Sequence, residues 1–134
     1  MRADRRVFLQ CLTVAAVAVT PGLTDLAGAQ GEHPMYGLIA KVTAVLGKRE
    51  ELIKILKEGT RSMPGCRSYI LAKDAADENA IWVTEIWDTA ASHDASLTLP
   101  AVKDSIAQAK PLIAGFERVA VTNPVGGVGF PSAN

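Results

Sequence analysis

The predicted elements follow the order strand, helix, strand, strand, helix, strand, which predicts an α+β fold of the ferredoxin-like βαββαβ type. Two observations support this prediction. Two segments repeat apolar residues at three- and four-residue steps, whereas four others are rich in β-branched and aromatic residues. The connections are short, and crossover connections are right-handed, so we expect a four-stranded antiparallel sheet with both helices on one face.

The first strand and helix occupy the segment before a Pro-Gly pair. The run MYGLIAKVTAV at 35–45 is typical of a strand, and residues 47–63 form an amphipathic pattern. Pro64-Gly65 then ends the predicted helix. Its inward stripe consists of Leu52, Ile55, Leu56 and Met63.

The middle of the chain predicts a hairpin followed by a short helix. Residues 66–74 and 80–88 read as strands, and the small polar loop AADEN between them favours antiparallel pairing. Residues 89–97 have the length of one or two helical turns. Asp88 or Thr89 is expected to cap the first amide groups of that helix.

A second main helix and a last strand complete the fold. The helix is predicted over 99–110, because Pro100 suits a first turn and Pro111 a helix end. Its inward residues are Val102, Ile106 and Ala109. The last strand is predicted over 115–123. The domain therefore spans 35–123, and the Gly/Pro-rich residues 124–134 are expected to form an irregular tail.

Residues 1–29 have the order of zones that is typical of a cleavable export signal. Arginines precede a short apolar run, and Ala27-Gly28-Ala29 is a small-x-small cleavage site. Arg5 and Arg6 resemble the twin-arginine export motif. The apolar run is too short to span a bilayer, so we expect a periplasmic or secreted protein without a stable membrane anchor. Residues 30–34 would form a flexible segment before the domain.

The charge and the soft ligands exclude several function classes. Fourteen basic residues balance fourteen acidic ones without a basic cluster, so a nucleic-acid partner is not expected. After signal cleavage Cys66 is the only cysteine, and His33, His93 and Cys66 do not have metal-site spacing. We therefore expect no metal site. The sheet face without helices is partly apolar, which predicts a homodimer.

The segment VTEIWDTAASHDASL at 83–97 contains the candidate site. Strand alternation places Glu85 and Trp87 on one face of the sheet. If that face meets the helices, Trp87 lines a cleft and His93 lies just above it. The alternative is that Trp87 is a core residue and His93 a capping or solvent-facing residue. A buried Glu85 would have a raised pKa and could act as acid or base.

Glu85 also has a purely structural interpretation, in which it forms an ion pair with Arg67, Lys73 or Arg118. Tyr36 and Tyr69 can donate hydrogen bonds to a bound oxygen or quinone. In the alternative, both tyrosines are packing residues of the sheet.

Several motifs in sequence order resemble the antibiotic biosynthesis monooxygenase family, a branch of the dimeric α+β barrel proteins. They are YGLIAKVTAVLGKREEL, PGC at 64–66, EIW at 85–87, HDASL at 93–97, LPAVKDSI and KPLIAGF. The resemblance covers about residues 35–122. Better-studied members carry an asparagine where this chain has Val83, and an arginine near the position of Ala107.

The resemblance implies a monooxygenase that oxidises quinol-like or polyphenolic aromatic compounds with O2 and without metal, flavin or haem. A deprotonated phenol is electron-rich enough to reduce O2, so the protein needs a proton acceptor, polar donors and apolar walls. The candidate catalytic residues are His93, as proton acceptor, with Trp87 and Glu85. The candidate substrate-binding residues are Tyr36, Tyr69 and Trp87. A non-catalytic exported dimer that binds an aromatic molecule is the alternative, and haem degradation ranks below it.

Overall fold

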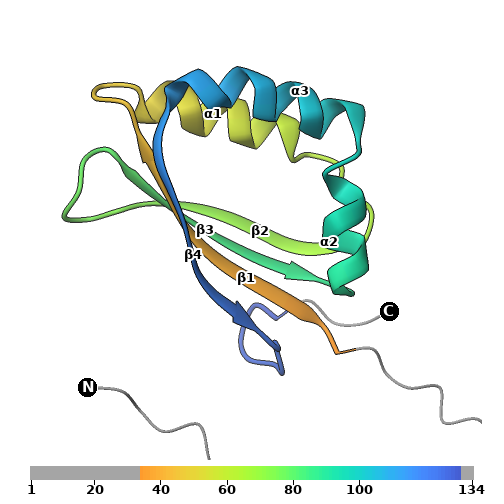
Figure 1. Cartoon of the computed structure of the whole chain (residues 1–134). Helices are drawn as coiled ribbons and strands as arrows, with labels where there is room; N and C mark the ends of the chain where they lie inside the picture. The colour runs from red at the N-terminus through yellow and green to blue at the C-terminus, as the bar shows by residue number, and fades with distance from the viewer. Residues whose placement is uncertain (1–33, 131–134) are drawn as a thin grey trace, which may run out of the picture. The chain divides into compact units, whose positions relative to one another are not determined.

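A computed structural model describes residues 34–130 of the chain (Figure 1). The predicted export signal at 1–29 lies outside the described residues, so that prediction stays open. His33 also lies outside them. The elements are β1 (Tyr36–Ala44), α1 (Arg49–Gly59), β2 (Cys66–Lys73), β3 (Ala80–Trp87), α2 (Ala90–Ser96), α3 (Pro100–Ala109), the 3-10 helix η1 (Lys110–Leu112) and β4 (Ile113–Thr122). The predicted element order is confirmed.

The four strands form one open antiparallel sheet in the order β2-β3-β1-β4. Strand β3 lies between β1 and β2, as a split βαβ unit requires. Helices α1 and α3 lie side by side over one face of the sheet, and α2 stands at one end of it (Figure 1). No helix of residues 34–130 covers the other face. The ferredoxin-like α+β fold is therefore confirmed.

The core lies between the sheet and the two long helices. On β1 every second residue is buried, and Leu52 of α1 is fully buried against this layer. In the register of the sheet, Leu38 lies opposite Glu85 and Ala40 opposite Val83. Directly opposed residues of an antiparallel pair point to the same face. Glu85 therefore projects from the sheet on the helix side.

Helix α1 ends at Gly59, so the predicted extension to residue 63 is wrong. The two long helices approach each other closely at this point, where Ser105 Oγ donates to the Ile55 carbonyl at 3.0 Å. A Cβ at Gly59 would stand 2.2 Å from the Ser105 Cβ. Thr60 Oγ1 donates to the Leu56 carbonyl and closes the last turn. Met63 consequently lies in the loop after the helix.

Helix α2 begins where the sequence predicted. The Thr89 side chain accepts a hydrogen bond from the Ser92 amide at 3.0 Å and so caps the helix. Asp88 instead pairs with Arg67. Gly65, with φ +81°, passes close to Ser92, and its carbonyl accepts the Asp88 amide. This tight corner fixes the start of α2 at the end of β3 and thereby positions His93.

The described part of the tail, 123–130, contains no helix or strand. Val125 and Val128 in this segment are exposed. Pro124 lies against Gly37, where a Cβ would stand 3.0 Å from its ring. Within residues 34–130, none of the helices has the length and apolar character needed to cross a membrane.

Candidate functional site

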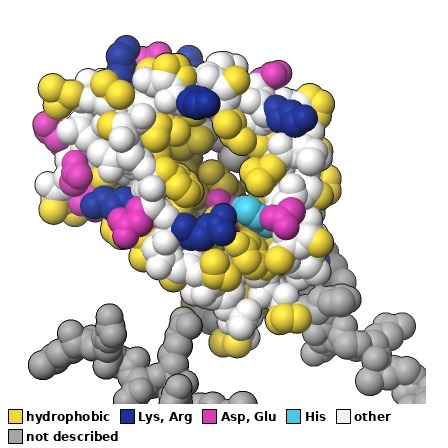
Figure 2. Space-filling model, viewed as in Figure 1, with side chains coloured by type: hydrophobic (Ala, Val, Ile, Leu, Met, Phe, Trp, Pro, Cys, Tyr) yellow, Lys and Arg dark blue, Asp and Glu magenta, His cyan; other side chains and the backbone are white. Residues whose placement is uncertain are grey.

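A hollow lies between the sheet and helices α1 and α3. It consists of two adjoining cavities of about 490 Å³ and about 320 Å³. They share walls formed by Leu56, Tyr69, Glu85, Ile106 and Phe116. Figure 2 shows the hollow with yellow apolar walls, and His93, cyan in that view, beside its opening. The size is that of a small-molecule site.

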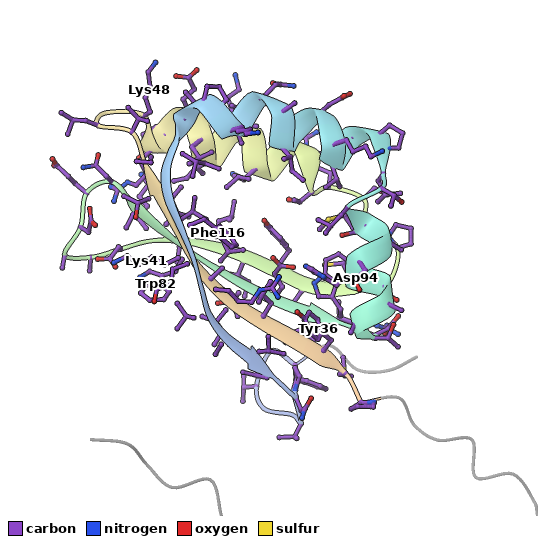
Figure 3. All side chains as sticks on the ribbon, viewed as in Figure 1. Tyr36, Lys41, Lys48, Trp82, Asp94 and Phe116 are labelled. Carbon is purple, nitrogen blue, oxygen red and sulfur yellow. The ribbon has the colours of Figure 1, made fainter. Side chains whose placement is uncertain are left out.

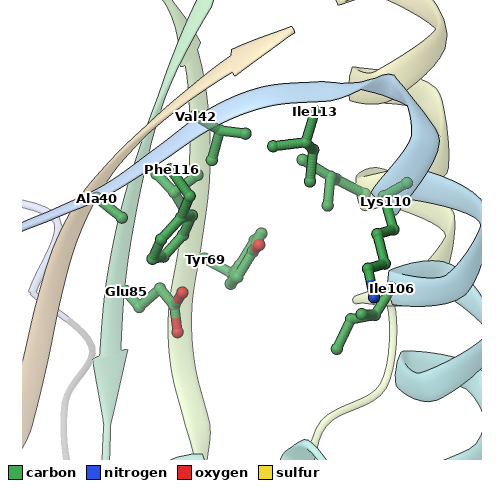
Figure 4. A pocket seen from close by; sticks show the side chains of 11 residues that line it. Ala40, Val42, Tyr69, Glu85, Ile106, Lys110, Ile113 and Phe116 are labelled. Carbon is green, nitrogen blue, oxygen red and sulfur yellow. The ribbon is translucent and has the colours of Figure 1, made fainter.

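The walls come from both layers of the fold. Tyr69, Glu85 and Phe116 project from the sheet, and Ile106 and Lys110 face them across the hollow (Figure 4). Ile106 was predicted to be an inward core residue, but 47% of it is exposed. It faces the hollow instead of packed side chains, because the sheet and α3 are separated at this level.

Glu85, Trp87 and His93 form one buried cluster at the end of the smaller cavity. The indole Nε1–H of Trp87 donates to Glu85 Oε2 at 2.7 Å. The same oxygen lies 3.9 Å from His93 Nε2. The rings of Trp87 and His93 meet edge to face, with centroids 5.5 Å apart. All three side chains line the smaller cavity, so the sequence-predicted residues come together.

The other ring nitrogen of His93 is directed to the surface. Nδ1 lies 3.2 Å from Asp94 Oδ1, and the Asp94 side chain is exposed. His93 itself is only 7% exposed, so the solvent-facing alternative for this residue is wrong. An imidazole with one nitrogen at a carboxylate and the other near a cavity has the arrangement of a proton acceptor.

Burial raises the pKa of Glu85 above the usual glutamate range. The Trp87 hydrogen bond and the charges of His93 and Arg118 act in the opposite direction, but burial is the larger effect. Raised carboxyl pKa values in a cavity are typical of groups that exchange protons. Glu85 is therefore a desolvated carboxyl whose Oε2 lies 3.9 Å from His93 Nε2, a separation longer than a hydrogen bond.

Two of the three cations that were considered as ion-pair partners of Glu85 pair with other carboxylates. Arg67 pairs with Asp88, and Lys73 pairs with Glu50 at 2.6 Å. Arg118 lines the smaller cavity and lowers the pKa of Glu85 through its charge, but no carboxylate of residues 34–130 lies within 4.0 Å of its guanidinium. The interpretation of Glu85 as a residue paired with Arg67 or Lys73 is wrong.

The two tyrosines occupy different positions. Tyr69 lines both cavities, and burial, together with the nearby Glu85 carboxylate, raises the pKa of its phenol. Tyr36 lines neither cavity. Its ring lies 5.3 Å from that of His93, at the α2 end of β1 (Figure 3). Tyr69 can contact a ligand directly, and Tyr36 supports the imidazole.

Cys66 lies beside this cluster. Burial and the Glu85 charge raise the pKa of its thiol, and its Sγ lies 3.6 Å from the Ser68 carbonyl. A raised pKa keeps the thiol protonated and unreactive. In the part of the chain that the structure describes, no group of three or more His, Cys, Asp or Glu residues is placed to hold a metal ion.

The sequence analysis missed two residues of the site, Phe116 and Lys110. Phe116 is 62% exposed, yet it lines both cavities and points into the hollow (Figure 3). The available signal was strand alternation, which places Phe116 and Arg118 on one face of the last strand. Lys110 had no sequence signal, because its direction depends on how α3 ends.

A model of the antibiotic biosynthesis monooxygenase family matches residues 35–108, more than half of the chain. The chain belongs to this family. The matched range runs from β1 into α3 and therefore contains Glu85, Trp87 and His93. No curated protein matches the chain.

Solved structures agree with this membership. A protein from Chloroflexus aurantiacus that carries the family name is 56% identical, covers 69% of this chain and 95% of its own, and superposes with a TM-score of 0.68. Proteins of the same description from Caulobacter crescentus and Nitrosomonas europaea are 20% and 14% identical. They cover 71% and 69% of this chain and 93% and 92% of their own, with TM-scores of 0.62 and 0.64. Because their sequence identity is low, these two structures support the shared fold and carry no conclusion about function.

The positions at which this chain departs from better-studied family members can now be located. Val83 is buried and lines the larger cavity, so an apolar side chain occupies the place of the asparagine. Ala107 is exposed on α3 and lines neither cavity. The polar side chains that line the two cavities include Glu85, His93, Tyr69, Arg118 and Lys110.

Proposed function

We propose that this protein is a cofactor-independent monooxygenase that oxidises quinol-like or polyphenolic aromatic compounds with O2. The observation that carries the proposal is the buried Glu85–His93 pair at the wall of an apolar hollow. The hollow is large enough for a flat ring system, and Phe116 offers a face for stacking. The pair supplies the proton acceptor that the reaction needs.

The proposed reaction balances without a further reductant. The hydroxyl proton of a hydroquinone moves to the Glu85–His93 pair, and the phenolate transfers electrons to O2 and binds it as a ring peroxide. The pair returns the proton to the peroxide. The O–O bond then breaks, the ring C–H proton leaves with the hydroxide as water, and a hydroxyquinone remains. The pair therefore first accepts and later donates the same proton.

The proposed role of Trp87 is to hold Glu85 in place. Its N–H donates to Oε2, the oxygen that faces His93, so the carboxylate cannot rotate freely. Tyr69 lies opposite Glu85 in the sheet and lines the same cavity, which supports a proposed role as hydrogen-bond donor to the substrate oxygen. A raised phenol pKa keeps that donor protonated.

The test is oxygen uptake by the purified full-length protein with a panel of hydroquinones, in the presence of a chelator. We expect uptake, with hydroxyquinone and water as products, and a rate about a hundredfold lower in His93→Ala. Ala91→Ser, at an exposed position of the same helix that lines neither cavity, is the control and should keep the rate. Binding of an aromatic ligand without oxygen consumption would select the non-catalytic alternative.

The second part of the proposal is a homodimer in which a second copy covers the sheet face without helices. Ile39, Trp82 and Ile86 lie half-buried on this face, and Ile70 is 56% exposed there. An apolar sheet face of this kind is typical of an interface. Light scattering after size exclusion is expected to give twice the chain mass, and a monomer at micromolar concentration would refute the dimer.

A further inference from the structure

The two cations that line the hollow have different electrostatic surroundings. Arg118, in the smaller cavity, acts on the pKa of Glu85 through its charge, whereas Lys110, in the larger cavity, does not. Among residues 34–130 no carboxylate lies within 4.0 Å of the Lys110 ammonium. Apart from Glu85 and the Tyr69 hydroxyl, the other walls of the larger cavity are apolar. The Lys110 ammonium thus forms no ion pair with Glu85, the carboxylate that lines the same cavity.

The place of Lys110 is set by the end of α3. It is the first residue of η1, directly after the buried Ala109. A lysine at a helix C-terminus interacts favourably with the last carbonyls, which gives Lys110 a structural role. Its side chain extends along the hollow beside Ile106, on the opposite side from Glu85 and Tyr69 (Figure 4). This direction also brings the ammonium to any ligand that fills the larger cavity.

We propose that the substrate is an aromatic acid, and that Lys110 binds its carboxylate while the Glu85–His93 pair receives its hydroxyl group. This inference rests on the proposed function, because it assigns the hydroxyl end of the ligand to the same pair. The rings lie between Phe116 of the sheet and Leu56 and Ile106 of the helices. A charge-assisted bond at one end and a hydroxyl at the other fix the ring orientation. Lys110 is therefore the residue that determines specificity.

The experiment measures binding rather than turnover. The ligands are a hydroxynaphthoic acid, with its hydroxyl and carboxyl groups at opposite ends of the ring pair, and its primary amide, which has the same shape without the charge. Titration calorimetry under anaerobic conditions uses the full-length protein. We expect the acid to bind about fivefold more tightly than the amide, since Lys110 is exposed to water. In Lys110→Met the preference should disappear, and amide affinity should change less than twofold.

Methionine keeps the apolar stem of Lys110 and removes only its charge, so the cavity wall is preserved. Lys103→Met is the matched control, because Lys103 lies exposed on α3 and lines neither cavity. It should keep the preference for the acid. A purely structural Lys110 would change thermal stability but leave the acid-to-amide ratio unchanged, and that result would overturn the inference.

Two outcomes separate this inference from the proposed function. If uncharged hydroquinones are oxygenated and the acid is not preferred, the aromatic-acid inference fails and the oxygenase stands. If the acid is preferred through Lys110 but no hydroquinone or phenolic acid consumes oxygen, the binding site stands and the oxygenase fails.

Discussion

Strand β3 carries two tryptophans, and each donates its indole N–H to a carboxylate. On the helix side Trp87 donates to Glu85, and on the opposite side Trp82 donates to Asp74, both at 2.7 Å. Lys41 and Trp82 lie on the side of the sheet away from Phe116 (Figure 3). The two indole hydrogen bonds have the same length, but the pKa values of the two carboxyl groups are shifted in opposite directions. The pKa of Asp74 falls to about 2, whereas the pKa of Glu85 rises.

The difference lies in the other neighbours of each carboxylate. Asp74 accepts the backbone amides of Ala76 and Asp77 at 2.8 Å each, and the Lys41 ammonium lies 3.8 Å away. Glu85 has no backbone donor among the residues described, and burial removes its water. Several donors hold a carboxylate ionised, while desolvation favours the neutral form. One indole donor does not decide between these effects, so the same kind of pair holds an ionised turn carboxylate on one face and a carboxyl with a raised pKa on the other.

The largest expected effect comes from removing each indole donor in turn. Trp87 is 1% exposed, so Trp87→Phe leaves a cavity and an unpaired buried carboxyl, and we expect a loss of about 3 kcal/mol in the free energy of unfolding. In Trp82→Phe, Asp74 keeps its two backbone donors, and we expect a loss of about 1 kcal/mol. Urea titration of both variants measures the difference. Equal losses would show that the two faces do not differ as described.

Oxygen uptake gives the same pair of variants a second readout. Trp87→Phe should slow turnover because Glu85 loses the donor that holds it near His93, whereas Trp82→Phe should not. Normal turnover in a correctly folded Trp87→Phe variant would remove Trp87 from the mechanism.

The sequence predicted this site to the extent that it depends on local periodicity. Two-residue alternation placed Glu85 and Trp87 on one face, and the short distance from β3 to α2 placed His93 beside them. Alternation could not predict the opposite pKa shifts, because these depend on burial and on donors from other segments. The Asp74 turn contributes two amides that no pattern in β3 reveals.

Other features of the structure could not be predicted, because they depend on contacts between elements that are far apart in the sequence. The close approach of α1 to α3 at Gly59 depends on Ser105, far along the chain. The direction of Lys110 depends on how α3 ends and η1 begins. Ile106 faces a hollow because α3 and the sheet are separated at this level. Periodicity predicts which face of a helix is apolar, but it does not predict the distance to the opposing layer.

A smaller effect is expected from Glu85→Gln, which keeps the side-chain shape and the acceptor for Trp87. The pKa of Glu85 is higher in the folded state than in the unfolded state, where it is about 4.3. The stabilisation that Glu85 provides is therefore fully present below about pH 4.3. It is lost as the pH rises through the raised folded-state pKa. Glutamine does not titrate, so the variant should gain stability relative to the wild type as the pH rises.

Thermal unfolding at a series of pH values measures this difference. His93, Arg118, Tyr69, Trp87 and Cys66 face or neighbour the Glu85 carboxyl, and all five are present in both proteins. A variant that becomes less stable than the wild type with rising pH would contradict the raised pKa.

The smallest effect is expected from Asp74→Asn, and its pH dependence should have the opposite sign. A pKa lowered to about 2 means that the stabilisation from Asp74 is complete above the unfolded value of about 3.9 and is lost as the pH falls towards 2. The wild type should therefore be slightly more stable than Asp74→Asn at neutral pH, because the charge strengthens its hydrogen bonds from Ala76, Asp77 and Trp82. This advantage should shrink below about pH 4. Acid titration followed by circular dichroism tests it. If the advantage instead persisted to pH 2, the turn would be stabilised by the shape of Asp74 and not by its charge, and the contrast with Glu85 would reduce to burial alone.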